Sequence, residues 1–273
     1  MRDYRGRVVA ITGAGSGIGR SLACRLAYQG ARLALSDINA DAVAATAREC
    51  QLRRAADVEH FALDVSDRDA VYAHADAVAD RLGAVHLVIN NAGVAVHAGV
   101  RAMTDEDMAW IMDINFWGVV HGTRAFLPHL IASGSGQVAN VSSVFGLISA
   151  PKDSAYNASK FAVRGFTESL RQELRIERQP VSVSCVHPGG IKTAIARTAR
   201  VGDGDDQAAV AALFDRVALT TPDSAARTII AGLRRDRARI LVGPDAWAIA
   251  ALPRLLGARY SFAVEKAARL LSV

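Results

Sequence analysis

The chain has 273 residues, 51% of them hydrophobic and 22% charged, which is enough to bury a large core. Its formal net charge is +5, but the lysines and arginines are mixed with acidic residues and form no basic stripe with aromatic platforms, so no nucleic-acid partner is expected. The three cysteines and seven histidines show no metal-ligand spacing, which predicts no metal site and reduced thiols, as in the cytoplasm.

Short apolar segments alternate with helical segments along the whole chain. Several of the apolar segments are suited to burial on both faces, as the strands of a parallel sheet are. The pattern predicts one α/β domain over residues 1–273, with a doubly wound parallel sheet of about seven strands and helices on both faces. The predicted strands cover 7–12, 32–36, 58–63, 85–90, 136–142, 181–187 and 238–242.

The first strand leads into a glycine-rich turn and then into a helical stretch, Arg20 to Gln29. The turn reads Thr12-Gly-Ala-Gly-Ser-Gly-Ile-Gly19, and its glycines are spaced G-x-x-x-G-x-G, which departs from the strict G-x-G-x-x-G pattern. Positions without side chains let the backbone approach a pyrophosphate at a helix N-terminus, where free N–H groups favour negative charge. Strand, turn and helix in this order predict a dinucleotide-binding loop.

The second strand ends at Asp37, twenty residues after Gly17. A carboxylate there can accept hydrogen bonds from the ribose hydroxyls of an adenosine and repels a 2′-phosphate, so NAD is the predicted cofactor. The positions that could form a phosphate clamp are uncharged: Ala14, Ser16, Ile38 and Asn39. Arg20 is the one basic group close by, and it leaves NADP as the alternative.

A tyrosine and a lysine, Tyr156 and Lys160, are spaced four residues apart in the longest predicted helix, about 154–178. That spacing places both side chains on one face. A neighbouring ammonium favours the phenolate, so we expect the pKa of Tyr156 to fall toward neutrality. The pair alone is weak evidence, because Tyr and Lys meet at this spacing in many solvated helices.

These motifs together resemble the short-chain dehydrogenase/reductase family over roughly residues 5–195. The matching residues are Thr12 to Gly19, Asp64-Val65, Asn90-Asn-Ala-Gly93, Asn115, Ser143, Tyr156 with Lys160, and Pro188-Gly189. The resemblance implies a Rossmann-like fold and an NAD(P)-dependent oxidoreductase. The cofactor-binding residues it implies are Gly13, Ser16, Gly17, Ile18, Gly19, Asp37, Asp64, Val65, Asn91, Ala92, Gly93, Tyr156, Lys160, Pro188, Gly189, Ile191 and Thr193.

The resemblance also implies a role for each catalytic residue. Tyr156 is the general acid/base, and Lys160 holds the nicotinamide ribose and lowers the tyrosine pKa. Ser143 steadies the substrate oxygen; Ser142 is its neighbour, and the distance of thirteen residues from Tyr156 favours Ser143. Asn115 holds a water in a proton relay.

Some of these residues also have simpler structural explanations. Asp64 could end a strand, and residues 90–93 could form a turn, since Asn and Gly tolerate left-handed backbone. Asn115 could be a polar interruption of an apolar helix, Ile111 to Val120, where a buried amide needs partners.

The expected reaction is reversible hydride transfer between NAD and a secondary alcohol or ketone. The segments expected over the site, 94–97, 144–148 and 190–221, are mostly apolar in their larger side chains, which favours a hydrophobic substrate. Residues 190–221 are expected to form a mobile lid with a short helix near 208–217. An NADPH-dependent carbonyl reductase and a catalytically silent dinucleotide sensor are the alternatives. We expect a cytoplasmic homodimer or homotetramer without a signal peptide.

The C-terminal extension, 244–273, lies beyond the family motifs. Its segment Ala246 to Leu271 mixes large apolar side chains with Arg254, Arg259, Lys266 and Arg269. Pro253 and Gly257 are expected to break any continuous helix, so no transmembrane span is predicted. Two explanations compete: a flap over the substrate pocket or a subunit neighbour, which we favour, and a basic amphipathic segment in peripheral contact with an anionic membrane.

Overall fold

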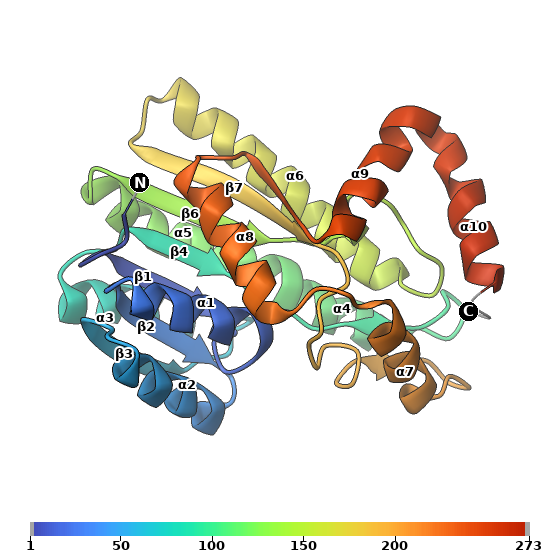
Figure 1. Ribbon diagram of the computed structural model, residues 1–273, viewed down its shortest axis with the longest axis horizontal. Helices are drawn as coiled ribbons and strands as arrows, with labels where there is room; N and C mark the ends of the chain where they lie inside the picture. The colour runs from blue at the N-terminus through green and yellow to red at the C-terminus, as the bar shows by residue number, and fades with distance from the viewer. Residues whose placement is uncertain (1–2, 271–273) are drawn as a thin grey trace.

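The computed structural model describes residues 3–270 (Figure 1). Its centre is a seven-stranded sheet with the order β3-β2-β1-β4-β6-β7-β9, and every neighbouring pair is parallel. The strands are β1 (Val8–Thr12), β2 (Arg32–Asp37), β3 (Asp57–Ala62), β4 (Leu87–Asn90), β6 (Gly136–Val141), β7 (Val181–Pro188) and β9 (Arg239–Val242). The predicted doubly wound parallel sheet is confirmed, and each predicted strand is shifted by at most two residues.

Helices cover both faces of the sheet (Figure 1). One face carries α1 (Gly17–Tyr28), α2 (Ala40–Leu52) and α8 (Pro222–Arg234), and the other carries α3 (Arg68–Leu82), α5 (Gly118–Ala132) and α6 (Ser154–Ile176). The long helix predicted around Tyr156 is α6.

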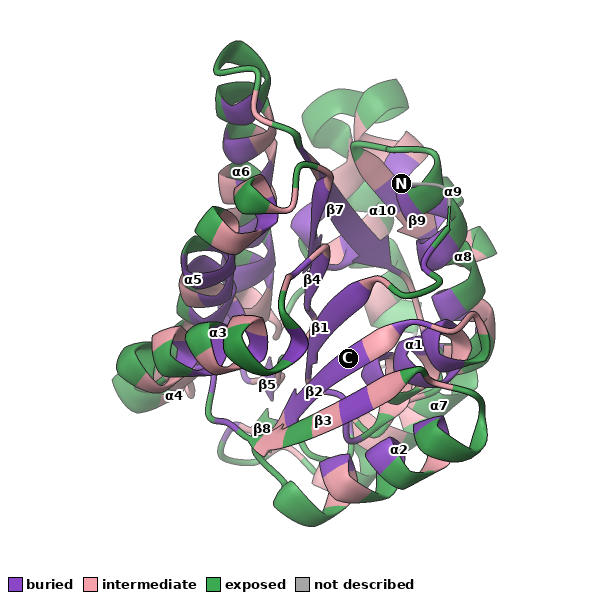
Figure 2. Cartoon of the chain, turned by 90° about the vertical axis from the view of Figure 1, so that its left-hand side faces the viewer, coloured by how far each residue is buried: buried purple, intermediate pink, exposed green. Residues whose placement is uncertain are grey.

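The side chains of β1 show how the two faces are filled. Val9 and Ile11 belong to the core beneath α1, α2 and α8, whereas Val8 and Ala10 belong to the core beneath α3, α5 and α6. Both sides of the strand are therefore buried, as the sheet in Figure 2 shows, and this explains its uninterrupted apolar sequence. The strand order runs in opposite directions from β1. In doubly wound folds the ligand-binding crevice lies at such a point, which here is the carboxyl ends of β1 and β4.

Two features of the middle of the chain are not predicted from the sequence. β5 (Val96–His97) pairs with β8 (Arg200–Val201) in a second, two-stranded parallel sheet. The apolar helix expected over 111–120 is divided: α4 (Asp105–Met112) passes through a π-helical turn, η1 (Asp113–Trp117), into α5. The short helix expected near 208–217 is α7 (Gln207–Val217).

The C-terminal segment forms α9 (Pro244–Leu256), a short 3₁₀ turn η3 (Gly257–Arg259) and α10 (Tyr260–Leu270), which together arch away from the sheet in Figure 1. The expectation that Pro253 breaks the helix is wrong. Pro253 lies in the last turn of α9, where the absence of its N–H removes few helix hydrogen bonds. The helix ends at Gly257, which has φ +53°. Leu271 and the residues after it lie outside the described residues. Within the described part of the chain, no helix is long and apolar enough to cross a membrane.

Candidate active site

The glycine turn after β1 is packed against the turn that follows β4. Gly13 has φ +64°, and a Cβ at this position would lie 2.8 Å from Ala92 Cα. Asn91 donates from Nδ2 to the carbonyl of Thr12 at 2.9 Å, and the Thr12 hydroxyl accepts the N–H groups of Asn91 and Ala92 at 3.0 Å. The structure therefore brings the predicted segments 12–19 and 91–93 together at the crevice, with Ser16 exposed at the N-terminus of α1.

Asp37 closes the other side of this turn. Its Oδ2 accepts the N–H of Gly15 at 2.9 Å, and its Oδ1 accepts the N–H of Asn39 at 3.0 Å. Each carboxylate oxygen retains acceptor capacity for a ribose hydroxyl. Arg20, the residue that left NADP open, donates from two guanidinium nitrogens to Glu49 at 2.9 and 2.7 Å.

Asp64 and Val65 follow β3 at the same edge of the sheet. The Asp64 carboxylate accepts the N–H and the hydroxyl of Ser66, at 2.9 and 2.7 Å, so part of its role is to organise the turn before α3. Val65 is buried against Gly118, where a Cβ would lie 2.8 Å from a Val65 methyl group. Asp64 itself is exposed.

The turn after β7, 188–193, lies across the crevice from the glycine turn. Thr193 faces Gly17, since a Cβ on Gly17 would lie 3.1 Å from the Thr193 methyl carbon. Gly189 donates to the carbonyl of Val242, and Lys192 to that of Thr220, both at 2.9 Å. We find no partner among residues 3–270 for the N–H of Ile191, so it remains as a donor for a ligand.

Tyr156 and Lys160 project from the N-terminal half of α6 beneath this edge. Lys160 Nζ lies 5.5 Å from the centroid of the Tyr156 ring, and it donates to the carbonyl of Val141 at 3.3 Å. A Cβ on Gly93 would lie 3.3 Å from the same nitrogen, which places the ammonium beside the 91–93 turn.

The pKa values differ from the expectation drawn from the pair. Burial raises the pKa of Tyr156 to about 12, partly opposed by its contact with the Ser143 side chain, and the negative charge of Asp153 adds to the rise. Burial lowers the pKa of Lys160 to about 8. Lys160 is not among the groups that shift the pKa of Tyr156, whose largest cause is desolvation.

Ser143 and Ser142 have distinct surroundings. Ser143 Oγ accepts the N–H of Phe145 at 3.1 Å, capping the 3₁₀ turn η2 (Val144–Gly146), and its hydroxyl faces Tyr156. Ser142 Oγ instead donates to the backbone carbonyl of Lys160 at 2.8 Å and is buried. The Ser142 hydroxyl is therefore used within the protein, whereas the Ser143 side chain lies beside Tyr156.

His187 is a further residue at this site that the sequence analysis misses. Its Nδ1 lies 2.8 Å from the carbonyl oxygen of Ser143, which can only accept, so Nδ1 carries the proton. The ring is fully buried, and burial lowers its pKa to about 4, so it is neutral. The one sequence feature that could have drawn attention to His187 is its position directly before the Pro188-Gly189 motif. A single histidine within an apolar strand forms no recognisable pattern of its own.

Asn115 lies in the π turn and is completely buried. Its Oδ1 accepts the N–H of Val94 at 2.8 Å, and its Nδ2 donates to the Val94 carbonyl at 3.0 Å and to Ser159 Oγ at 3.1 Å. Both amide hydrogens are thus used within the protein. The buried amide therefore has the partners that a purely structural polar residue in this helix would need.

Apolar side chains surround the Tyr156 ring. Phe145 approaches it edge to face at 6.2 Å between centroids. Tyr156 also packs against an apolar cluster that includes three methionines, and the other members of this cluster are Val94, Val96, Ala98, Met103, Met108, Trp110, Ile111, Met112 and Ala155.

The start of the expected lid is held to the body of the protein. Arg200 pairs with Asp107 at 3.0 Å and lies 3.9 Å from the Trp110 ring centroid. Asp205 accepts from Lys152 Nζ at 2.8 Å. By contrast, α7 has no buried residue, so it is the least anchored part of 190–221.

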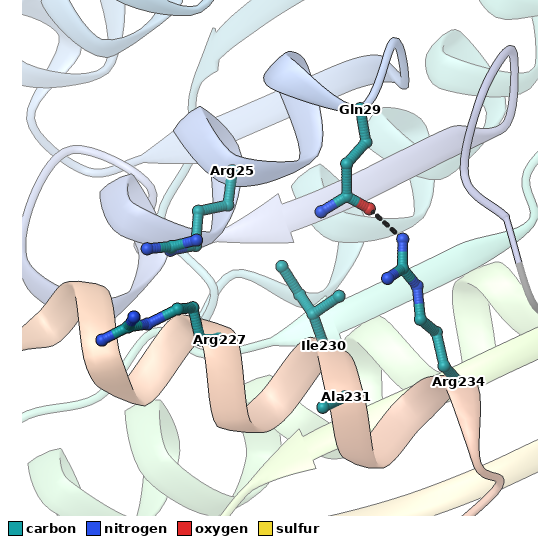
Figure 3. Close-up of a pocket in the computed structure, with 6 residues that line it drawn as sticks. All are labelled: Arg25, Gln29, Arg227, Ile230, Ala231 and Arg234. Atoms are coloured by element: carbon teal, nitrogen blue, oxygen red, sulfur yellow. Dashed lines mark hydrogen bonds between the residues drawn. The ribbon is translucent and has the colours of Figure 1, made fainter.

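Two further observations concern metal ligands and a pocket elsewhere on the surface. Among residues 3–270, no three His, Cys, Asp or Glu side chains are grouped to hold a metal ion. A surface pocket between α1 and α8 is lined by Arg25, Arg227, Ile230 and Arg234 (Figure 3), and none of the predicted site residues lines it. Arg25 in that pocket is already paired with Asp223 at 2.5 Å.

A doubly wound sheet with a glycine turn and a Tyr/Lys pair at its carboxyl edge is the architecture of a dinucleotide-dependent oxidoreductase. Residues 7–203 match the family model described as short chain dehydrogenase. The Mycobacterium tuberculosis protein SadH is 54% identical over 261 residues, which cover 95% of this chain and 94% of SadH. Mouse epidermal retinol dehydrogenase 2 is 39% identical over 193 residues, 70% of this chain and 62% of the mouse protein.

A solved short-chain dehydrogenase/reductase from Burkholderia phymatum, in complex with NAD, has 32% sequence identity and a TM-score of 0.87. The match covers 93% of this chain and 95% of that one. The chain belongs to the short-chain dehydrogenase/reductase family, as its motifs indicated. It is therefore an oxidoreductase acting on CH–OH groups.

Proposed function

We propose that the protein transfers a hydride between NAD and the carbinol carbon of a hydrophobic secondary alcohol, or the corresponding ketone. The observation that carries this proposal is the convergence of Tyr156, Lys160 and the hydroxyl of Ser143 at the strand edge that also holds the glycine turn. The glycine turn, Asp37 and the N–H of Ile191, which has no partner among residues 3–270, fit a dinucleotide laid along this edge.

The side chains have complementary tasks. Bound NAD supplies the hydride acceptor or donor. In reduction, Tyr156 gives its phenolic proton to the substrate oxygen, and in oxidation it takes the hydroxyl proton back. Ser143 donates to the same oxygen as negative charge develops there. Lys160 binds the nicotinamide ribose, and its ammonium favours the phenolate when a proton has left Tyr156.

We assign Asn115 a positioning role together with its place in the proton relay. Its side chain holds Val94 through both backbone groups, which keeps the 91–93 turn against Lys160. Because neither amide hydrogen is free, a relay water would bind to an oxygen of this residue.

Three observations support NAD over NADP and a hydrophobic substrate over a polyol. Asp37 occupies the position that a 2′-phosphate would need, and Arg20 is committed to Glu49. The surroundings of Tyr156 are aromatic, aliphatic and methionine side chains, which adapt to apolar ligands. Among the relatives, the mouse protein is named for retinol, an apolar alcohol.

The test is a steady-state assay of the purified protein with NAD and NADP, using secondary alcohols of increasing chain length and a polyol as control. We expect NAD to be preferred and kcat/KM to rise with chain length. The Tyr156→Phe variant should lose at least ~10²-fold in kcat while the Kd for NADH changes by less than about threefold. NADH binding without turnover of any substrate would instead indicate a sensor, and a preference for NADPH a carbonyl reductase.

The remaining expectations stay predictions. They are a single catalytic domain with a lid over 190–221 and an extension from 244, a homodimer or homotetramer, and a cytoplasmic location. The contact of α9 with η2, the turn capped by Ser143, supports the flap explanation for the extension. The exposed Trp247, Leu255, Phe262 and Leu270 leave a subunit or membrane contact open to α9 and α10.

A further inference from the structure

Asp245, in the first turn of α9, reaches from the C-terminal segment to the turn after β7. Its Oδ2 accepts the N–H of Gly190 at 2.6 Å. The preceding N–H, that of Gly189, donates to the carbonyl of Val242 at 2.9 Å. A Cβ at 189 would overlap the Asp245 carboxylate, so glycine at this position allows the carboxylate to sit directly on the backbone.

The opposite side of the same turn is fixed by Thr220. The Thr220 N–H donates to the carbonyl of Gly190 at 3.1 Å, and its carbonyl accepts the N–H of Lys192 at 2.9 Å. The turn is thus held between two segments, and Ile191 is left with the N–H that has no partner in the described chain. Asp245 is the one side chain in this clamp that binds the backbone.

One oxygen of this half-buried carboxylate is placed at a cost to stability. Asp245 Oδ1 is buried and has no hydrogen-bond partner among residues 3–270, and an unpaired buried acceptor costs free energy. An acidic residue does stabilise the first turn of a helix, but this effect needs no burial. Asp223 shows this: it follows Pro222 in α8 as Asp245 follows Pro244 in α9, and it is exposed and paired with Arg25.

We propose that Asp245 is a positioning residue that holds the 189–192 turn in the conformation that binds the nicotinamide half of the cofactor. This rests on the proposed function. Asp37 lies at the end of β2, whereas the 189–192 turn follows β7, beside Ser143 at the end of β6. A dinucleotide whose adenosine meets Asp37 therefore places its nicotinamide at the turn that Asp245 holds.

The test compares the affinity for NADH with that for ADP-ribose, which lacks the nicotinamide. Asp245→Ala removes the acceptor, Asp245→Asn keeps an acceptor oxygen without the charge, and Asp223→Ala is the matched helix-terminus control. Tryptophan fluorescence titration gives the Kd of NADH, and competition gives that of ADP-ribose.

We expect Asp245→Ala to weaken NADH binding by about tenfold, since one partly buried hydrogen bond is lost, while ADP-ribose binding changes by less than about twofold. Asp245→Asn should bind NADH within about threefold of wild type, and Asp223→Ala should change neither ligand. Equal weakening of both ligands by Asp245→Ala, or an Asn variant as weak as the Ala variant, would overturn the proposal. A wild-type protein that binds neither ligand would overturn the proposed function itself.

Discussion

Replacing Ser143 by alanine should separate catalysis from packing at this site. Ser143 Oγ uses a lone pair to accept the Phe145 N–H, and its hydrogen is the one we assign to the substrate oxygen. Loss of one such donor to a developing oxyanion typically costs ~10²–10³-fold in kcat. The lost cap of η2 should lower the free energy of unfolding by only about 1 kcal/mol.

Ser142→Ala is the matched control, because the two serines are adjacent and make opposite use of their hydroxyls. Ser142 donates to the Lys160 carbonyl in the interior, so its loss should lower the free energy of unfolding by about 1 kcal/mol. For a chain of this size that is a fall in Tm of about 2–4 °C. Its kcat, measured well below Tm, should stay within about threefold of wild type.

The assay is steady-state alcohol oxidation with NAD at saturating concentrations, combined with thermal unfolding of each variant. Ser143→Thr, which restores a hydroxyl, should recover part of the lost kcat. The reasoning is refuted if Ser142→Ala loses as much kcat as Ser143→Ala, since the buried hydroxyl would then be the one that acts on the substrate.

Four further predictions follow from the same structure. With the pKa of Tyr156 raised to about 12, the phenolate fraction grows about tenfold per pH unit, so kcat/KM for alcohol oxidation should rise from pH 6 to 8 while that for ketone reduction does not. Above pH 8 Lys160 loses its charge and the rise should weaken; a flat oxidation profile from pH 6 to 8 would contradict this. Asp37→Ala with Ile38→Arg should shift preference from NAD toward NADP, measured as the ratio of kcat/KM values, and a wild-type preference for NADP would exclude the reasoning. Burial lowers the pKa of His74 and of His187 to about 4, so as the pH falls from 6.5 only the unfolded chain takes up these protons. Each histidine should therefore lower the free energy of unfolding by about 2–3 kcal/mol at pH 4.5. Urea unfolding of His74→Leu should show a smaller loss of stability between pH 6.5 and 4.5 than wild type, and an equal loss would contradict this prediction. Truncation after Leu256 removes η3 and α10, and we expect an altered KM for the alcohol with no liposome sedimentation of either form; sedimentation of the full chain alone would favour the membrane explanation.

The sheet could be predicted because its central strands are buried on both faces, which leaves a continuous apolar run such as Val8 to Ile11. β5 and β8 could not, because two residues each give no periodicity and their pairing depends on a lid more than 100 residues away in sequence. The C-terminal helix was misjudged at Pro253, where proline near a helix end costs little.

The site was predicted less evenly. Motifs fix which residues meet, and the glycine turn, Asp37, Ser143, Tyr156 and Lys160 do lie at one edge of the sheet. Desolvation is not visible in a spacing, so the sequence suggested a lowered pKa for Tyr156 where burial raises it. His187 and Asp245 act through backbone contacts that leave no motif.

The π turn at 113–117 shows why one irregular element is retained beside such a site. One extra residue in a helix rotates everything after it by about 100°. Asn115, within the π turn, binds the backbone of Val94. Gly118 and Gly122, which follow the turn, lie against Val65 and Asn90, where a Cβ would not fit. The helix thus holds the 91–94 segment through Asn115 and, within about two turns, packs Gly118 and Gly122 against Val65 and Asn90. The π turn is the point at which these two sets of contacts meet.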